Sequence, residues 1–220
     1  MAEPQRSRVK PTDLRGILQY IPKFREKIFV VSIDGAIVSD ENFANLLLDF
    51  AVLRSLNIRV VLVNGAASQI AAMAIQRSVE PSDLDGTEPV DAATLELALT
   101  AANRLTHEIL EGFTANELRG VSTNAVTARP KGIIDGNDFF FAGKAERIDL
   151  AHLEGLLVQG NIPVIPPLGF DREGNTYRLN SDDLAREVAV KLKAAKLIYV
   201  TTHDGLIHNG EVIRQIPNGK

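Results

Sequence analysis

Two short segments of the sequence combine small and polar residues at the point where an apolar run ends. Ser32-Ile33-Asp34-Gly35 ends a run that begins at Ile28, and Asn64-Gly65-Ala66-Ala67 ends a run that begins at Arg59. Runs rich in β-branched residues are typical of buried parallel strands, whose carboxyl ends meet at one edge of a sheet. Backbone N–H groups in loops of small residues can approach an anion there. One interpretation is therefore an anion-binding cleft, with Ser32, Gly35, Asn64, Gly65 and Ala66 as its candidate residues.

The same residues also have a purely structural interpretation. Any tight turn between a strand and a helix favours a glycine, and Ala66-Ala67 lacks the conformational freedom of a glycine run. Asp34 would repel a polyphosphate unless a metal ion bridged the two. Asn180-Ser181-Asp182-Asp183 opens a predicted helix, where its carboxylates complement the helix dipole. The residue types alone leave both interpretations open.

Other catalytic signatures are missing from the sequence. It contains no Walker A loop, GxGxxG, GxSxG or HExxH motif. Its lack of cysteine excludes disulfides, thiolate metal sites and cysteine nucleophiles. The four histidines show no metal-ligand spacing apart from His203 and His208, which lie near a predicted hairpin. We therefore expect no metal site.

The composition is that of an ordinary globular protein. Of 220 residues, 45% are hydrophobic, and 24 basic residues against 28 acidic ones give a formal charge of −4, which argues against a nucleic-acid partner. No apolar run has the length of a membrane span, and residues 1–11 lack the apolar segment of a signal peptide. We expect a cytoplasmic protein without a membrane partner, with a flexible arm at 1–11 and one domain at 12–220.

Apolar periodicity predicts alternating strands and helices, as in an α/β protein with a mainly parallel sheet. Two further β-type runs, 125–129 and 138–142, are followed by glycines and suggest antiparallel strands. Ser68 is the predicted N-cap of its helix, and Asp91 that of the longest one. The expected strands are 28–33, 59–63, 162–165 and 197–200, and the expected helices are 12–23, 41–56, 68–77, 91–110, 149–158 and 181–195.

Several stretches in register give the chain a family resemblance. They include 29–31, 61–66 and, above all, 126–138, which reads Val-Thr-Ala-Arg-Pro-Lys-Gly-Ile-Ile-Asp-Gly-Asn-Asp. From about Asp13 to Lys220 the chain resembles the amino-acid kinase superfamily, and within it the N-terminal domain of bacterial N-acetylglutamate synthases. Residues 126–138 look like a signature of the synthases that acetylglutamate kinases do not share. The resemblance implies a three-layer αβα sandwich of the acetylglutamate kinase type, with a mainly parallel sheet and some antiparallel strands.

The chain departs from the family's kinases at the positions that carry their chemistry. A phosphate-binding lysine corresponds to Ser32, a His-Gly-Gly-Gly loop corresponds to residues 64–67, and a substrate-binding arginine corresponds to Glu88. An asparagine of the kinase site corresponds to Arg178, whereas an organising aspartate is retained at Asp182. The resemblance thus implies no catalytic residue in this segment. It implies a vestigial phosphate or nucleotide cleft at Ser32, Gly35, Asn64, Gly65, Ala66 and Asp182, and a vestigial substrate position at Glu88 and Arg178.

The implied function is that of a regulatory and oligomerisation domain. The parent protein would be an amino-acid N-acetyltransferase that makes N-acetyl-L-glutamate from acetyl-CoA and L-glutamate, the first step of arginine biosynthesis. Acetyl transfer would belong to a GNAT-type domain that is absent here, and the kinase-like domain itself looks truncated at its C-terminal end. We expect no cofactor in this segment, a homo-oligomer, and L-arginine as the candidate effector. The alternatives are a divergent acetylglutamate kinase, which Ser32 and Glu88 argue against, and a freestanding sensor module of the arginine pathway.

Overall fold

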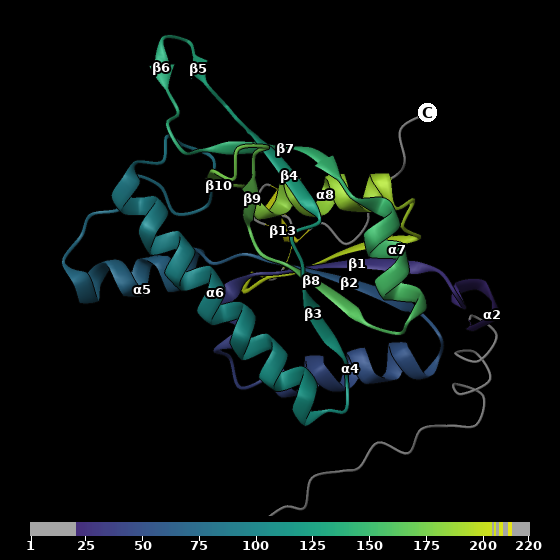
Figure 1. The fold of residues 1–220 in the computed structure, drawn as a ribbon. Helices are drawn as coiled ribbons and strands as arrows, with labels where there is room; N and C mark the ends of the chain where they lie inside the picture. The colour runs from purple at the N-terminus through teal and green to yellow at the C-terminus, as the bar shows by residue number, and fades with distance from the viewer. Residues whose placement is uncertain (1–20, 204, 206, 209–210, 213–220) are drawn as a thin grey trace, which may run out of the picture.

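A parallel sheet of five strands forms the centre of the fold in the computed structural model, which describes residues 21–203, 205, 207–208 and 211–212 (Figure 1). The strands are β1 (Ile28–Ile33), β2 (Arg59–Asn64), β3 (Gly120–Ser122), β8 (Ile162–Ile165) and β11 (Lys196–Val200). They follow the order β11-β1-β2-β8-β3, and all four pairings are parallel. The predicted parallel sheet is confirmed.

A second sheet and two hairpins supply the antiparallel strands. Their strands are β4 (Val126–Pro130), β5 (Ile133–Ile134), β6 (Asn137–Asp138), β7 (Gly143–Ile148), β9 (Leu168–Phe170), β10 (Thr176–Arg178), β12 (Ile207–His208) and β13 (Glu211–Val212). The second sheet has the order β10-β9-β4-β7, in which β4 pairs antiparallel with β7 and parallel with β9. The β5–β6 hairpin projects away from the rest of the fold (Figure 1).

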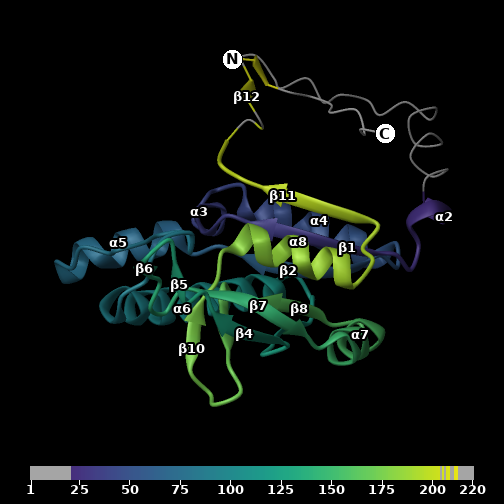
Figure 2. The same cartoon turned by 90° about the horizontal axis from the view of Figure 1, so that it is seen from above.

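Helices cover both faces of the five-stranded sheet. They are α2 (Ile21–Phe24), α3 (Gly35–Val38), α4 (Phe43–Ser55), α5 (Ala67–Arg77), α6 (Ala92–Ala115), α7 (Leu150–Val158) and α8 (Ser181–Lys191). One core cluster joins the sheet to α4, α5 and α6, and a second joins it to α7 and α8. Figure 2 shows α8 running alongside β1. The arrangement is the expected three-layer αβα sandwich.

Strand β2 explains why the sheet needs helices on both faces. Val60 and Leu62 belong to the cluster under α4, α5 and α6, whereas Val61 and Val63 belong to the cluster under α7 and α8. All four side chains are fully buried. Successive residues of a strand point to opposite faces, so a continuous apolar run is stable only when both faces are covered.

Four described helices start at a residue whose side chain caps them, and the first is α3, where the Asp34 carboxylate accepts from the backbone N–H of Ala36 at 3.1 Å. The Asp91 carboxylate accepts a hydrogen bond from the backbone N–H of Thr94 at 2.7 Å, as predicted. The Asp149 carboxylate caps α7, and the Asn180 side chain accepts from two backbone N–H groups at the start of α8. Each cap satisfies donors that have no partner within the helix.

Three details of the sequence prediction are wrong. Ser68 is not the N-cap of α5, which begins one residue earlier, and its hydroxyl donates to the Gln69 side chain instead. The expected strand 138–142 is interrupted because the Asp138 carboxylate accepts from the backbone N–H of Phe140, whose φ of 45° is left-handed. Helix α8 ends at Lys191, before a left-handed Lys193. Residues 1–20, which include the expected arm and most of the expected helix 12–23, lie outside the described residues.

Candidate functional site

A cavity of about 160 Å³ lies at the carboxyl edge of the parallel sheet. It is lined by the ends of β1 and β2 and by the start of α8, with Ser32, Gly65, Ala66 and Asp182 among its residues. The two loops meet because β1 and β2 are neighbours, and the backbone N–H of Gly65 donates to the Ile33 carbonyl at 2.8 Å. We call this space the Ser32–Asp182 cavity. It brings together four of the six residues predicted for a phosphate cleft.

Carboxylates dominate the electrostatics of the Ser32–Asp182 cavity. The Ser32 hydroxyl donates to the Asp182 carboxylate at 3.4 Å, and Asp34 and Asp85 also line the space. Partial burial raises the pKa of Asp182, and the nearby charges of Asp34, Asp183 and Asp85 raise it further, against the lowering effect of the Ser32 hydrogen bond. The cavity is therefore negatively charged when its aspartates are ionised.

Gly35 and Asn64 lie beside the cavity without lining it. The Gln69 side-chain amide donates to the Gly35 carbonyl at 2.8 Å, and a Cβ atom on Gly35 would collide with Gln69 and lie 2.9 Å from the Gly65 carbonyl. Glycine is thus required by the close approach of the two loops. Asn64 is fully buried, and neither atom of its side-chain amide has a hydrogen-bond partner among the described residues. Such a group lowers the stability of the fold.

The two residues predicted for a substrate position have different surroundings. Arg178 lines the cavity with a side chain that is 1% exposed, but its guanidinium donates to the main-chain carbonyls of Pro167, Leu179 and Leu84 at 3.0, 2.7 and 3.0 Å. Burial lowers the pKa of Arg178 to about 10, so it is still charged at neutral pH. Glu88 is exposed and does not line the cavity. The structure does not bring the two side chains into one site.

The sequence analysis did not identify several residues that line the cavity, among them Asp85, Asn180 and Tyr199. The Asn180 side chain donates to the Asp85 carbonyl at 3.1 Å, and the Tyr199 hydroxyl donates to the Asp182 carbonyl at 3.3 Å. Asp83 shapes the loop that carries Asp85, since its carboxylate accepts from the backbone N–H groups of 86, 87 and 88. An aspartate three residues before a glycine is the local signal of such a turn.

Two further properties concern the described part of the chain as a whole. Within it, no group of three or more histidine, aspartate or glutamate side chains is arranged to hold a metal ion. None of the helices in residues 21–203 is long and apolar enough to cross a membrane.

A parallel sheet with helices on both faces and a cavity at its carboxyl edge defines an α/β domain of the class whose members bind ligands at that edge. The sequence matches the model of the amino acid kinase family over residues 27–218. This chain belongs to the amino acid kinase family.

Known proteins similar to this chain are longer than it is. An amino-acid acetyltransferase of Pseudomonas fluorescens strain Pf-5 is 34% identical over 213 residues, which are 92% of this chain and 49% of the relative. The N-acetylglutamate synthase of Neisseria gonorrhoeae with coenzyme A and N-acetylglutamate has a TM-score of 0.85 at 32% identity, covering 94% of this chain and 49% of that one. Its complex with coenzyme A and L-arginine has a TM-score of 0.84 at 31% identity, covering 92% and 50%. The resemblance to these synthases is confirmed, and the chain spans about half the length of the curated relatives it matches.

Replacing Arg178 should destabilise the fold strongly. Arg178→Met removes the donors to three main-chain carbonyls, and two of these carbonyls belong to buried residues. Because the buried carbonyls are left without a hydrogen-bond partner, the free energy of unfolding should fall by about 3 kcal/mol or more. Urea unfolding of the two proteins measures the difference. Arg172→Met, at an exposed arginine between β9 and β10, is the matched control and should change stability by less than about 0.5 kcal/mol. Equal effects of the two substitutions would contradict this role of Arg178.

Asp182→Asn should stabilise the protein at neutral pH. Because the pKa of Asp182 is raised in the fold, ionising it costs stability above the unfolded-state pKa of about 3.9, and this cost disappears below that pH. The gain in stability of Asp182→Asn over the wild type should therefore be present at pH 7 and vanish as the pH falls toward about 4. Thermal unfolding of both proteins across this pH range measures it.

Asp171→Asn is the control of opposite sign. Hydrogen bonds, first of all from the Asn175 side chain, lower the pKa of Asp171. Its ionised form therefore stabilises the fold above the unfolded-state pKa, and this contribution is lost as the pH falls through the lower folded-state pKa. Asp171→Asn should lower stability at pH 7. A loss of stability in Asp182→Asn at pH 7 would contradict the assignment for Asp182.

Proposed function

We propose that this chain is the amino-acid-kinase-like half of an N-acetylglutamate synthase and that it does not itself transfer phosphoryl groups. Similarity to amino-acid acetyltransferases along 92% of the chain supports the first part. Acetyl transfer from acetyl-CoA to L-glutamate would then belong to the half of those relatives that this chain does not match. The parent protein would act in the cytoplasm, at the first step of arginine biosynthesis.

The charge of the Ser32–Asp182 cavity is the observation that supports the proposed lack of phosphoryl transfer. Phosphoryl transfer depends on cations that neutralise the transferring group. Among the described residues that line the cavity, Asp34, Asp85 and Asp182 are the acids and Arg178 is the only arginine or lysine. Three of the five N–H donors of the Arg178 guanidinium are directed at main-chain carbonyls. Two like charges about 4 Å apart near a protein surface repel by about 4 kcal/mol, so ionised aspartates here disfavour a polyphosphate.

We assign the domain a regulatory and assembly role. A solved structure of the N. gonorrhoeae synthase carries L-arginine as well as coenzyme A, which supports L-arginine as an effector of this chain's parent protein. Leu48 and Val52, four residues apart on α4, are 56% and 55% exposed. Apolar side chains at this spacing lie on one face of a helix and support a homo-oligomer in which that face is covered.

The chain should release no ADP from ATP and Mg²⁺ in response to N-acetyl-L-glutamate. Without a free cation in the cavity, we expect turnover at least about 10³-fold below that of an acetylglutamate kinase assayed alongside. A coupled assay for ADP measures it. ADP release that requires N-acetyl-L-glutamate and is abolished by Asp182→Asn would instead establish a divergent kinase.

The native protein from its source cells should have about twice the 23.9 kDa mass of this chain and should acetylate L-glutamate. The expected mass follows from the 49% share of the relative that the chain covers. Intact-mass spectrometry of protein captured with an antibody against this domain, followed by an assay for N-acetylglutamate, tests both. A native mass near 23.9 kDa without acetyl transfer would contradict the synthase assignment and favour a freestanding sensor module.

A further inference from the structure

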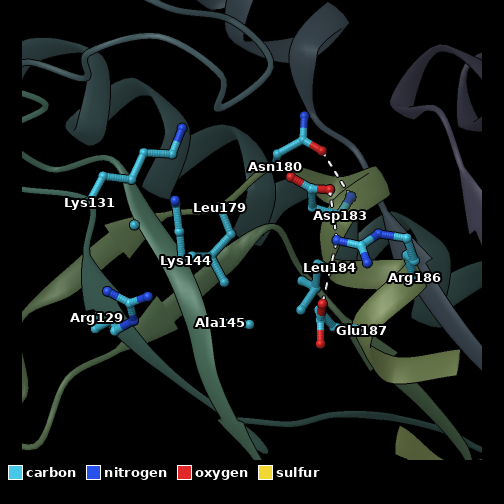
Figure 3. A pocket seen from close by; sticks show the side chains of 11 residues that line it. Arg129, Lys131, Lys144, Ala145, Leu179, Asn180, Asp183, Leu184, Arg186 and Glu187 are labelled. Atoms are coloured by element: carbon cyan, nitrogen blue, oxygen red, sulfur yellow. Dashed lines mark hydrogen bonds and ion pairs between the residues drawn. The ribbon is translucent and has the colours of Figure 1, made fainter. Parts of the chain in front are cut away.

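A second cavity, of about 280 Å³, lies between the second sheet and helix α8 and shares only Asn180 with the Ser32–Asp182 cavity. We call it the β4–β7 cavity. Figure 3 shows Arg129, Lys131 and Lys144 along one side of it, and Asp183, Arg186 and Glu187 of α8 along the other. Apolar side chains, Leu179, Leu184 and Ala145, complete the lining.

The sheet side of this cavity contains a pair of like charges in direct register. Arg129 of β4 and Lys144 of β7 are partners in the antiparallel pairing. Side chains that lie directly opposite in such a pair are neighbours, and two like charges there destabilise the sheet. Among the ion pairs formed by the described residues, none includes either side chain. The two positive charges therefore lie opposite each other without an ion-pair partner among the described residues.

Lys131 adds a third cation in a defined position. Its ammonium group donates to the Gly86 and Thr87 carbonyls, at 2.9 Å each, and lies 5.2 Å from the centre of the Phe139 ring. An ammonium group has three N–H donors, so one is left for a ligand. Burial and the neighbouring Lys144 lower the pKa of Lys131, whereas the carboxylates of Asp83, Asp183 and Glu88 raise it. An anion in the cavity would add to this raising effect.

The carboxylates on the α8 side are paired with a cation of their own helix. Asp183 and Glu187 each form an ion pair with Arg186, at 3.3 and 3.4 Å. The three α8 side chains thus carry one net negative charge together. Four cations against two carboxylates leave the cavity with a net positive charge concentrated along β4 and β7.

We propose that the β4–β7 cavity binds a small dianion, held between Arg129 and Lys144 on the sheet. A planar guanidinium beside an ammonium group is the arrangement that binds phosphate and carboxylate groups well. The volume is at the low end for small-molecule sites, which limits the ligand to a phosphate ion, a small phosphate ester or a short dicarboxylate. This site is separate from the acidic cavity at the edge of the parallel sheet and has the opposite charge.

Calorimetric titration of the chain with inorganic phosphate and, separately, with succinate at constant ionic strength tests the proposal. At least one probe should bind saturably at one site per chain, and the double variant Arg129→Gln/Lys144→Gln should weaken that binding at least tenfold. Arg147→Gln is the matched control, because Arg147 is an exposed arginine on β7 that does not line the cavity, and its dissociation constant should match the wild type.

The two probes distinguish a phosphate-bearing ligand from a dicarboxylate ligand. Tighter binding of phosphate identifies a phosphate-bearing ligand, and tighter binding of succinate identifies a dicarboxylate; either result supports the site. Circular dichroism checks the fold of each variant, and the single variants Arg129→Gln and Lys144→Gln carry the same test if the double variant unfolds. The proposal is overturned if neither probe binds saturably, or if binding is equal in the wild type and in the folded Arg129 and Lys144 variants.

Discussion

The buried guanidinium of Arg178 is the interaction on which the geometry of both cavities depends. It donates hydrogen bonds to the main-chain carbonyls of three segments. These are the turn after β8 at Pro167, the segment before α8 at Leu179, and the loop at Leu84. A charge that is 1% exposed is stable only with such partners, so these segments can separate only at a considerable cost in free energy. The loop that lines one cavity and borders the other is positioned by this contact.

That loop, residues 83–88, is bound from both sides. Asn180 donates to its Asp85 carbonyl from the side of the Ser32–Asp182 cavity. Lys131 donates to its Gly86 and Thr87 carbonyls from the side of the β4–β7 cavity. The acidic and the basic cavity are thus adjacent, and their opposite charges are separated by one short segment of main chain and by Asn180, which lines both.

The fold of this chain and the charge at the edge of its sheet have different physical origins. Membership of the amino acid kinase family requires a chain that buries apolar residues on both faces of a parallel sheet, and many positions contribute to that requirement. The chemistry at the sheet edge depends on a few charged side chains, which can change without disturbing the core. Ser32 illustrates this, since it continues the buried strand β1 and also supplies a hydroxyl rather than a cation to the cavity.

The local elements of this fold can be predicted from the amino-acid sequence. Continuous apolar runs identify β1, β2 and β8, because an unbroken run is what a strand covered on both faces needs. Asp91 identifies the start of α6 because a cap acts on backbone groups only three residues away. The family resemblance further indicated the meeting of Ser32 and Asp182, which are 150 residues apart.

Which charged side chains are available to a ligand depends on long-range contacts that the sequence does not reveal. Arg178 could have faced a substrate, and its binding to the Leu84 carbonyl joins residues 94 positions apart. The opposition of Arg129 and Lys144 depends on a register that shifts between Thr127 and Ala128, which no local pattern announced. Local rules describe groups close together along the chain, whereas the charge of a cavity is the sum over segments that folding brings together.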